Sequence, residues 1–203
     1  MGDQSFEAIE ATLKKAVAAL REAQVDFLLA GSLASWARGG PETRHDLDFI
    51  VKSEQAELAL EALAQKGMRP ERPPEEWLYK AWDDDLLIDV IFHPRGLPVT
   101  DEVIQRGEEL HVLGMTVPVM AIEDVLATKL LAITEHRVDY SDLLEVARAL
   151  REQIDWRALR VRTRGSPYAA AFFVLVEELG VVPEQHAAHG ADVRVIGPPA
   201  TPS

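Results

Sequence analysis

The chain has 203 residues, of which 47% are hydrophobic and none is cysteine. This length suits one domain of ordinary size or two small lobes that share a core. The lack of cysteine excludes disulfides, thiol catalysis and thiolate metal sites. A formal net charge of −13 argues against unspecific binding of nucleic acid over the whole surface. No apolar stretch approaches the roughly 20 residues of a membrane span, and no secretory signal pattern is present. We therefore expect a cytoplasmic protein without membrane contact.

Hydrophobic periodicity divides the chain into an α+β part and a helical part. We expect a first lobe over 1–118, a helical lobe over 119–181 and a disordered tail over 182–203, which is rich in Pro, Gly, Ala and His. The predicted helices cover 5–23, 31–38, 54–66, 100–107, 121–135, 139–152, 155–163 and 167–179. The predicted strands cover 25–30, 45–51, 77–82 and 86–92, with short β segments near 111 and over 115–120.

Two aspartates interrupt the apolar strand predicted over 45–51. Asp46 and Asp48 are two residues apart, so on a strand they share one face, roughly 7 Å from each other. Asp89 lies in the same way within the later apolar run LLIDVIF. Like charges and desolvation raise the pKa of such carboxylates, and divalent cations remove both costs. The three aspartates are therefore candidate ligands for two Mg²⁺ ions, or for Mn²⁺ in their place. The alternative is three solvent-facing strand residues.

Gly31 and Ser32 follow the strand predicted over 25–30 and open a short helix. Free backbone N–H groups at such a turn, together with the Ser32 hydroxyl, suit phosphate oxygens. The alternative is a plain turn with serine as the N-cap. Arg38 and Arg44 flank the glycine-rich turn and are candidate phosphate contacts, unless they are ordinary surface arginines.

The order of these motifs resembles the signature of the nucleotidyltransferase superfamily of the DNA polymerase β type. The signature reads hydrophobic-Gly-Ser, thirteen residues, Asp-hydrophobic-Asp-hydrophobic, and a later hydrophobic-Asp-hydrophobic strand, and it covers about residues 25–92. The resemblance implies an α+β fold with a small mixed sheet flanked by helices, followed by a helical bundle lobe. It also implies transfer of a nucleoside monophosphate from an NTP to an acceptor hydroxyl, with release of pyrophosphate.

The same resemblance implies roles for the motif residues. Gly31 and Ser32 would hold the triphosphate of the NTP. Asp46 and Asp48 would bind the metals, and Asp89, the third catalytic carboxylate, would ligate a metal and assist the attacking hydroxyl.

The helical part carries a second resemblance. Its segment IEDVLATKLLAITEHRVDYSDLLEVARAL is similar to the AbiEii-type nucleotidyltransferase toxins, including the mycobacterial MenT group. This implies that Lys129 contacts the triphosphate as a catalytic residue and that Asp139 and Asp142 belong to the nucleotide site. Arg137 lies near the place of a basic residue of that group, whereas Val138 departs from its pattern. The alternatives are an extended surface lysine at 129 and helix-capping roles for the two aspartates.

The acceptor depends on this second resemblance. It implies RNA, with a tRNA 3′ end as the acceptor and the six arginines of 148–164 as a docking face, and it implies a small antitoxin protein as a partner. One alternative is a small molecule such as an aminoglycoside, whose amines suit the acidic turn 83–85. Others are a protein side chain as acceptor, or a nucleotide-binding partner protein without turnover.

Histidines and tryptophans carry weaker signals. His45 and His93 stand beside carboxylates without metal-ligand spacing, so we expect neither to be a ligand. The four tryptophans, Trp36, Trp77, Trp82 and Trp156, are expected to pack, and stacking of Trp77 on a base stays open.

Overall fold

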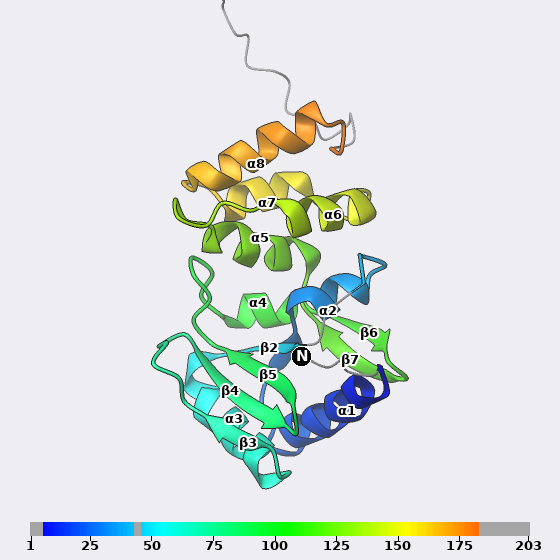
Figure 1. Ribbon diagram of the computed structural model, residues 1–203, viewed down its shortest axis with the longest axis vertical. Coiled ribbons are helices and arrows are strands. Elements are labelled where there is room, and N and C mark those ends of the chain that lie inside the picture. Colours follow the sequence, from blue (N-terminus) through cyan, green and yellow to red (C-terminus); the bar gives the residue numbers. More distant parts are fainter. Residues whose placement is uncertain (1–5, 43–45, 183–203) are drawn as a thin grey trace, which may run out of the picture.

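A computed structural model describes residues 6–42 and 46–182. Arg44, His45 and the predicted tail from residue 183 onward lie outside the described residues. Seven strands form one mixed sheet in the order β3-β4-β5-β2-β1-β7-β6 (Figure 1). The strands are β1 (Phe27–Leu29), β2 (Leu47–Val51), β3 (Arg69–Glu71), β4 (Leu78–Asp83), β5 (Leu86–Ile91), β6 (Glu108–Val112) and β7 (Met115–Val119).

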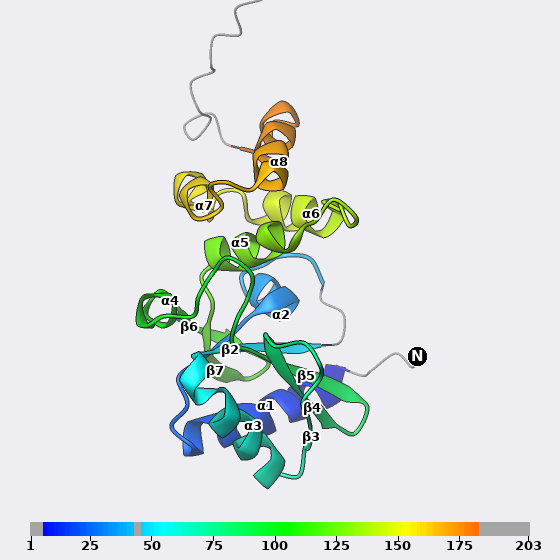
Figure 2. The same ribbon diagram turned by 90° about the vertical axis from the view of Figure 1, so that its left-hand side faces the viewer.

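Helices cover both faces of this sheet and continue beyond it. They are α1 (Phe6–Glu22), α2 (Gly31–Trp36), the 3₁₀ turn η1 (Ser53–Gln55), α3 (Ala56–Gln65), α4 (Asp101–Gln105), α5 (Ile122–Ala132), α6 (Ser141–Leu150), α7 (Trp156–Arg162) and α8 (Pro167–Glu178). Helices α1 and α3 pack below the sheet, α2 and α5 lie above it, and α6 to α8 stack on α5 (Figure 2). This arrangement confirms the predicted α+β class. The predicted lobe boundaries stay a prediction.

Strand β5 shows how the sequence separates the core from the opposite face of the sheet. Leu86, Ile88 and Val90 are buried, while the residues between them are half-buried. A strand places alternate side chains on opposite faces, so Asp89 and Ile91 share the face that α5 covers. In the parallel pairing of β2 with β5, Asp48 lies opposite Asp89. The fold therefore brings the two predicted aspartate strands side by side.

The predicted elements agree with the structure apart from boundary shifts and one missed strand. Strand β3 is short and polar, with Pro70 at its centre, and it pairs with β4 at the edge of the sheet. It carries no apolar alternation, and proline is tolerated at such an edge, so the strand has no sequence signal. Among the described residues, none of the helices combines the length and apolar character needed to cross a bilayer.

Candidate active site

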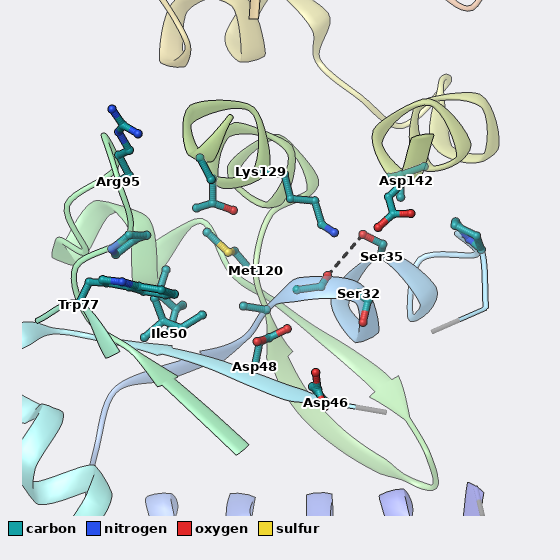
Figure 3. A pocket seen from close by; sticks show the side chains of 18 of the residues that line it. Ser32, Ser35, Asp46, Asp48, Ile50, Trp77, Arg95, Met120, Lys129 and Asp142 are labelled. Carbon is teal, nitrogen blue, oxygen red and sulfur yellow. Dashed lines mark hydrogen bonds between the residues drawn. The ribbon is translucent and has the colours of Figure 1, made fainter. Parts of the chain in front are cut away.

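A cleft of about 1530 Å³ lies between the sheet and helices α5 and α6. Side chains from the sheet form its floor, and α5 and α6 form its roof (Figure 3). Residues from α2 and from the segments before β4 and after β5 complete the walls. The predicted site residues that line it are Gly31, Ser32, Asp46, Asp48, Lys129 and Asp142.

Asp46 and Asp48 reach the cleft through the two-residue period of β2. Asp46 is exposed just before the strand, Asp48 is half-buried within it, and the next residue on the same face is Ile50. Asp89 does not itself line the cleft; it lies beside Asp48 on the neighbouring strand β5, and Lys80 lies opposite it on β4. Lys80 Nζ donates to Asp89 Oδ1 at 3.0 Å. Three adjacent strands thus present a row of charges, two negative and one positive.

These surroundings raise the pKa of the Asp48 carboxyl group. Burial, followed by repulsion from Asp89 and Asp46, raises the pKa of the Asp48 carboxyl to about 7. Lys129 and Lys80 act in the opposite direction. The site concentrates negative charge around the half-buried Asp48 carboxylate, and the two lysines offset it only in part.

The turn from β1 into α2 brings the backbone against Asp48. The Ala30 N–H donates to the Asp48 carbonyl oxygen at 2.8 Å. Gly31 has a φ of +61°, in the left-handed region that glycine favours, and the Asp48 carboxylate occupies the place of a side chain at position 31. Ser32 lines the cleft beside it (Figure 3).

Lys129 extends from α5 into the cleft above Asp48 (Figure 3). Among the residues that the structure describes, it forms no ion pair, so its charge is available to a ligand. Asp142 of α6 faces the cleft too, and Glu145 lies three residues further on the same helix. The structure therefore brings Lys129 and Asp142 to the aspartates.

Two other predicted residues lie elsewhere. The side chain of Arg38 is 7% exposed, with Nη1 donating to Glu108 Oε2 at 2.8 Å and Nη2 donating to the carbonyl oxygen of Met120 at 3.1 Å. It ties the end of α2 to β6 and β7. Asp139 accepts a hydrogen bond from the Ser141 N–H at 2.9 Å, which lowers the pKa of its carboxyl. Neither residue lines the cleft.

The two surfaces considered for the acceptor lie outside the cleft as well. In the acidic turn, Asp83 accepts from Thr12 at 2.8 Å and forms an ion pair with Lys15. In the segment 148–164, Arg160 pairs with Glu177 and Arg162 with the buried Asp124. Neither segment contributes to the cleft lining.

The cleft includes residues that the sequence analysis missed. They are Glu42, Ile50, Ile91, Arg95, Met120 and Glu145, together with smaller lining residues. Trp77, whose stacking on a base was left open, and His93, which was expected not to be a ligand, line the cleft as well. Glu145 stands at i+3 from Asp142, and this spacing was a usable signal because it places both carboxylates on one helix face. Arg95 had no such signal, since only the pairing of β4 with β5 brings the segment after β5 to the cleft.

The donor set suits a hard divalent cation bound together with phosphate. Within residues 6–42 and 46–182, no three histidine or carboxylate side chains are arranged to hold one metal ion. Magnesium, however, is commonly bound by one or two carboxylates plus substrate phosphates and waters. Asp46 and Asp48 supply such a pair, and a bound cation would offset the burial and the repulsion that raise the pKa of Asp48. The residues fit the ion.

Comparisons with known proteins agree with this geometry. A family model described as nucleotidyl transferase of unknown function (DUF2204) matches residues 9–171. Among solved structures, the antibiotic-resistance factor ANT(2″)-Ia superposes with a TM-score of 0.60 at 17% identity, covering 87% of this chain and 99% of that one. Its complex with adenylyl-2″-tobramycin gives a TM-score of 0.59 at 15% identity, covering 81% and 99%.

A third structure, a Thermotoga maritima protein assigned as a nucleotidyltransferase, gives a TM-score of 0.51 at 18% identity and covers 63% of this chain and 86% of that one. No curated protein matches the chain. These likenesses confirm the predicted fold. The narrower AbiEii-type resemblance stays a prediction.

Proposed function

The chain belongs to the nucleotidyl transferase family described as DUF2204, and from this premise we propose that it moves a nucleoside monophosphate from an NTP to an acceptor hydroxyl. Pyrophosphate leaves as the acceptor oxygen bonds to the α-phosphorus. The observation that carries the proposal is the carboxylate row of Asp46, Asp48 and Asp89, with the Asp48 pKa raised to about 7. Bound cations would neutralise the repulsion among these carboxylates, and a nucleoside triphosphate enters a site as its magnesium complex.

Asp46 and Asp48 would hold Mg²⁺, which supplies charge stabilisation to the phosphates when bound. Asp89 would accept the proton of the acceptor hydroxyl or orient that hydroxyl, and Lys80 fixes its carboxylate. Lys129 would neutralise phosphate charge from the roof of the cleft, and Ser32 would donate to a phosphate oxygen from the wall. This chemistry depends mainly on positioning and on electrostatic stabilisation.

Charge in the cleft favours a cationic small molecule as the acceptor. Glu42, Asp142 and Glu145 line the cleft and add three carboxylates to the aspartate row. Asp142 lies on the side of Asp46 (Figure 3). Such a wall attracts amines and repels a polyanion. A fold that also occurs in a complex with adenylyl-2″-tobramycin accommodates a nucleotidylated small molecule. An acceptor that bears both hydroxyls and amines is thus our first candidate.

The RNA acceptor and the antitoxin partner are implied by the AbiEii-type resemblance alone and stay predictions. Two of the arginines expected to dock RNA, Arg160 and Arg162, are engaged in ion pairs within the chain. RNA therefore enters the experiment as the second acceptor to be tested.

The experiment uses α-labelled NTPs with Mg²⁺ and supplies either amine-bearing acceptors, such as tobramycin, or total RNA. Thin-layer chromatography follows label on small molecules, and a denaturing gel follows label on RNA. Label on the small molecule that Asp48→Ala fails to transfer supports the first candidate, and label on RNA alone supports the second. No label on any acceptor, together with no pyrophosphate release, would contradict the proposed function.

A further inference from the structure

The cleft is divided by polarity along β2. Asp46 and Asp142 lie at one end of the cleft, whereas Ile50 and Trp77 lie at the other end, with Arg95 above them (Figure 3). Ile50 follows Asp48 on the same face of the strand, roughly 7 Å away at the usual strand rise. Met120 lies above Ile50, towards α5, and Trp77 stands beside Ile50 (Figure 3). A ligand whose charged part lies at Asp48 thus meets an apolar wall immediately beyond it.

Trp77 differs from the other tryptophans of the chain. Trp156 is buried and its indole donates to the Arg151 carbonyl at 3.0 Å, and the indole of Trp82 donates to Glu71 at 2.8 Å. Trp36 packs edge-on against Phe6. Trp77 is 44% exposed, and within the described part of the chain its indole donates no hydrogen bond.

The backbone fixes this exposed indole at the cleft. Trp77 directly precedes β4, and its carbonyl oxygen accepts hydrogen bonds from the N–H groups of Phe92 and His93, both at 3.1 Å. The indole therefore belongs to a paired strand end and not to a free loop. An aromatic side chain kept half-exposed on a rigid cleft wall is suited to take a planar ligand group.

We propose that Trp77 forms the stacking wall for the nucleobase of the NTP, with Ile50 and Ile91 beneath it. This inference rests on the proposed function, because it takes the α-phosphate to lie at Asp46 and Asp48. The base is the planar, uncharged part of the nucleotide, and it is separated from the α-phosphate by the ribose. The distance along β2 from Asp48 to Ile50 suits that separation.

The opposite end of the cleft offers no comparable place. Its lining side chains Glu42, Asp142 and Glu145 are acidic, and none is aromatic. They would repel the phosphates of a nucleotide that lay in that direction. The base at Trp77 leaves this acidic end free for the cationic acceptor, so the two substrates occupy different ends of one cleft. Stacking tolerates every base, so we expect modest discrimination among the four NTPs.

The test measures nucleotide binding without acceptor and without turnover. Isothermal titration of the full-length protein uses a non-hydrolysable α,β-methylene ATP with Mg²⁺, and inorganic tripolyphosphate with Mg²⁺ as the matched ligand without a base. Trp77→Ala should weaken the nucleotide roughly 10- to 100-fold, as loss of one stacked base does, and leave tripolyphosphate unchanged. Trp77→Phe should keep most of the nucleotide affinity. Leu58→Ala, a side chain on α3 with the same 44% exposure, is the control.

Two results would overturn the stacking role alone. One is nucleotide affinity that Trp77→Ala leaves at the wild-type value, and the other is an equal loss for nucleotide and tripolyphosphate. A wild-type protein that binds neither ligand would overturn the proposed function, and this inference with it.

Discussion

The carboxylate of Asp48 lies so close to Gly31 that a Cβ atom at position 31 would fall 1.7 Å from Asp48 Oδ2. The glycine also has a φ of +61°, which residues with a Cβ rarely adopt. These two facts explain why the turn after β1 has glycine at this point. The turn and the carboxylate are one packing unit, so the backbone of Gly31 and Ser32 is fixed relative to Asp48.

Gly31→Ala should therefore abolish activity by displacing the Asp48 carboxylate. Left-handed backbone alone costs a residue with a Cβ about 1–2 kcal/mol of folding free energy. Gly67→Ala is the matched control, because Gly67 has a φ of +84° and nothing within 4 Å of its added Cβ. We expect both variants to lower the unfolding free energy and only Gly31→Ala to lose turnover. Equal turnover in the two variants would contradict the packing account.

Asp48 should make the stability of the cation-free protein depend on pH. Its folded-state pKa of about 7 exceeds the ordinary value of 3.8, so the native state holds the proton more tightly than the unfolded state. This contribution is fully present below pH 4 and is lost as the pH rises toward 7. In EDTA, Asp48→Asn should therefore gain thermal stability over the wild type between pH 5 and 8.

Thermal unfolding at each pH measures this difference. Asp84→Asn is the control, because Asp84 is an exposed turn residue with a φ of 52° that asparagine also tolerates. Parallel pH profiles for the wild type and Asp48→Asn would show that the Asp48 pKa is not raised.

Lys80 should act as a positioning residue for Asp89. Its Nζ donates to Asp89 Oδ1 at 3.0 Å from the neighbouring strand. Lys80→Met should lower kcat about 10- to 100-fold, as loss of a hydrogen-bond partner that orients an active-site carboxylate does, with little change in the KM for NTP. Lys80→Arg should restore most of the rate. Lys66→Met, which removes a 2.7 Å pair with Glu22 far from the cleft, should leave kcat unchanged.

Asp124 should hold the helix that carries Lys129. Its fully buried carboxylate pairs with Arg106 at 2.8 Å and with Arg162 at 2.9 Å, which joins α5 to α7 and to the end of α4. Asp124→Ala leaves both guanidinium groups without their partner and should lower the unfolding free energy by about 3–5 kcal/mol. Denaturant titration measures this loss.

Asp155→Ala is the control for that titration. It removes only the N-cap of α7, whose side chain accepts from the Ala158 N–H, and should cost about 1 kcal/mol. An Asp124→Ala loss no larger than that of the control would contradict the account.

The sequence predicted the part of the site that depends on local periodicity. Asp46 and Asp48 share a face because strand side chains alternate, and the same rule oriented Asp89. Sheet topology decided the rest. Arg38, a candidate phosphate contact, instead forms hydrogen bonds to β6 and β7. These strands lie near it because β7 pairs with β1, a contact between segments about 90 residues apart. That pairing has no local signature.

Helix faces were only partly predictable. Lys129 lies on a helix whose sequence does not show which face points to the cleft. The packing of α5 on α2 places the Lys129 side chain near Asp48. Asp139 and Asp142 were equivalent in sequence. In the structure, Asp139 accepts a hydrogen bond from the backbone N–H of Ser141, whereas Asp142, in the first turn of α6, lines the cleft.

Nucleotidyl transfer itself is tested most directly by following two labels of one NTP. The protein is incubated with Mg²⁺, an amine-bearing acceptor and ATP labelled at either the α- or the γ-phosphate, with Asp48→Asn as the inactive variant and Glu135→Ala, an exposed carboxylate outside the cleft, as the control. The account predicts that α-label moves to the acceptor, γ-label appears only in pyrophosphate, and Asp48→Asn loses several orders of magnitude in rate. Transfer of γ-label to the acceptor, or full activity of Asp48→Asn, would contradict it.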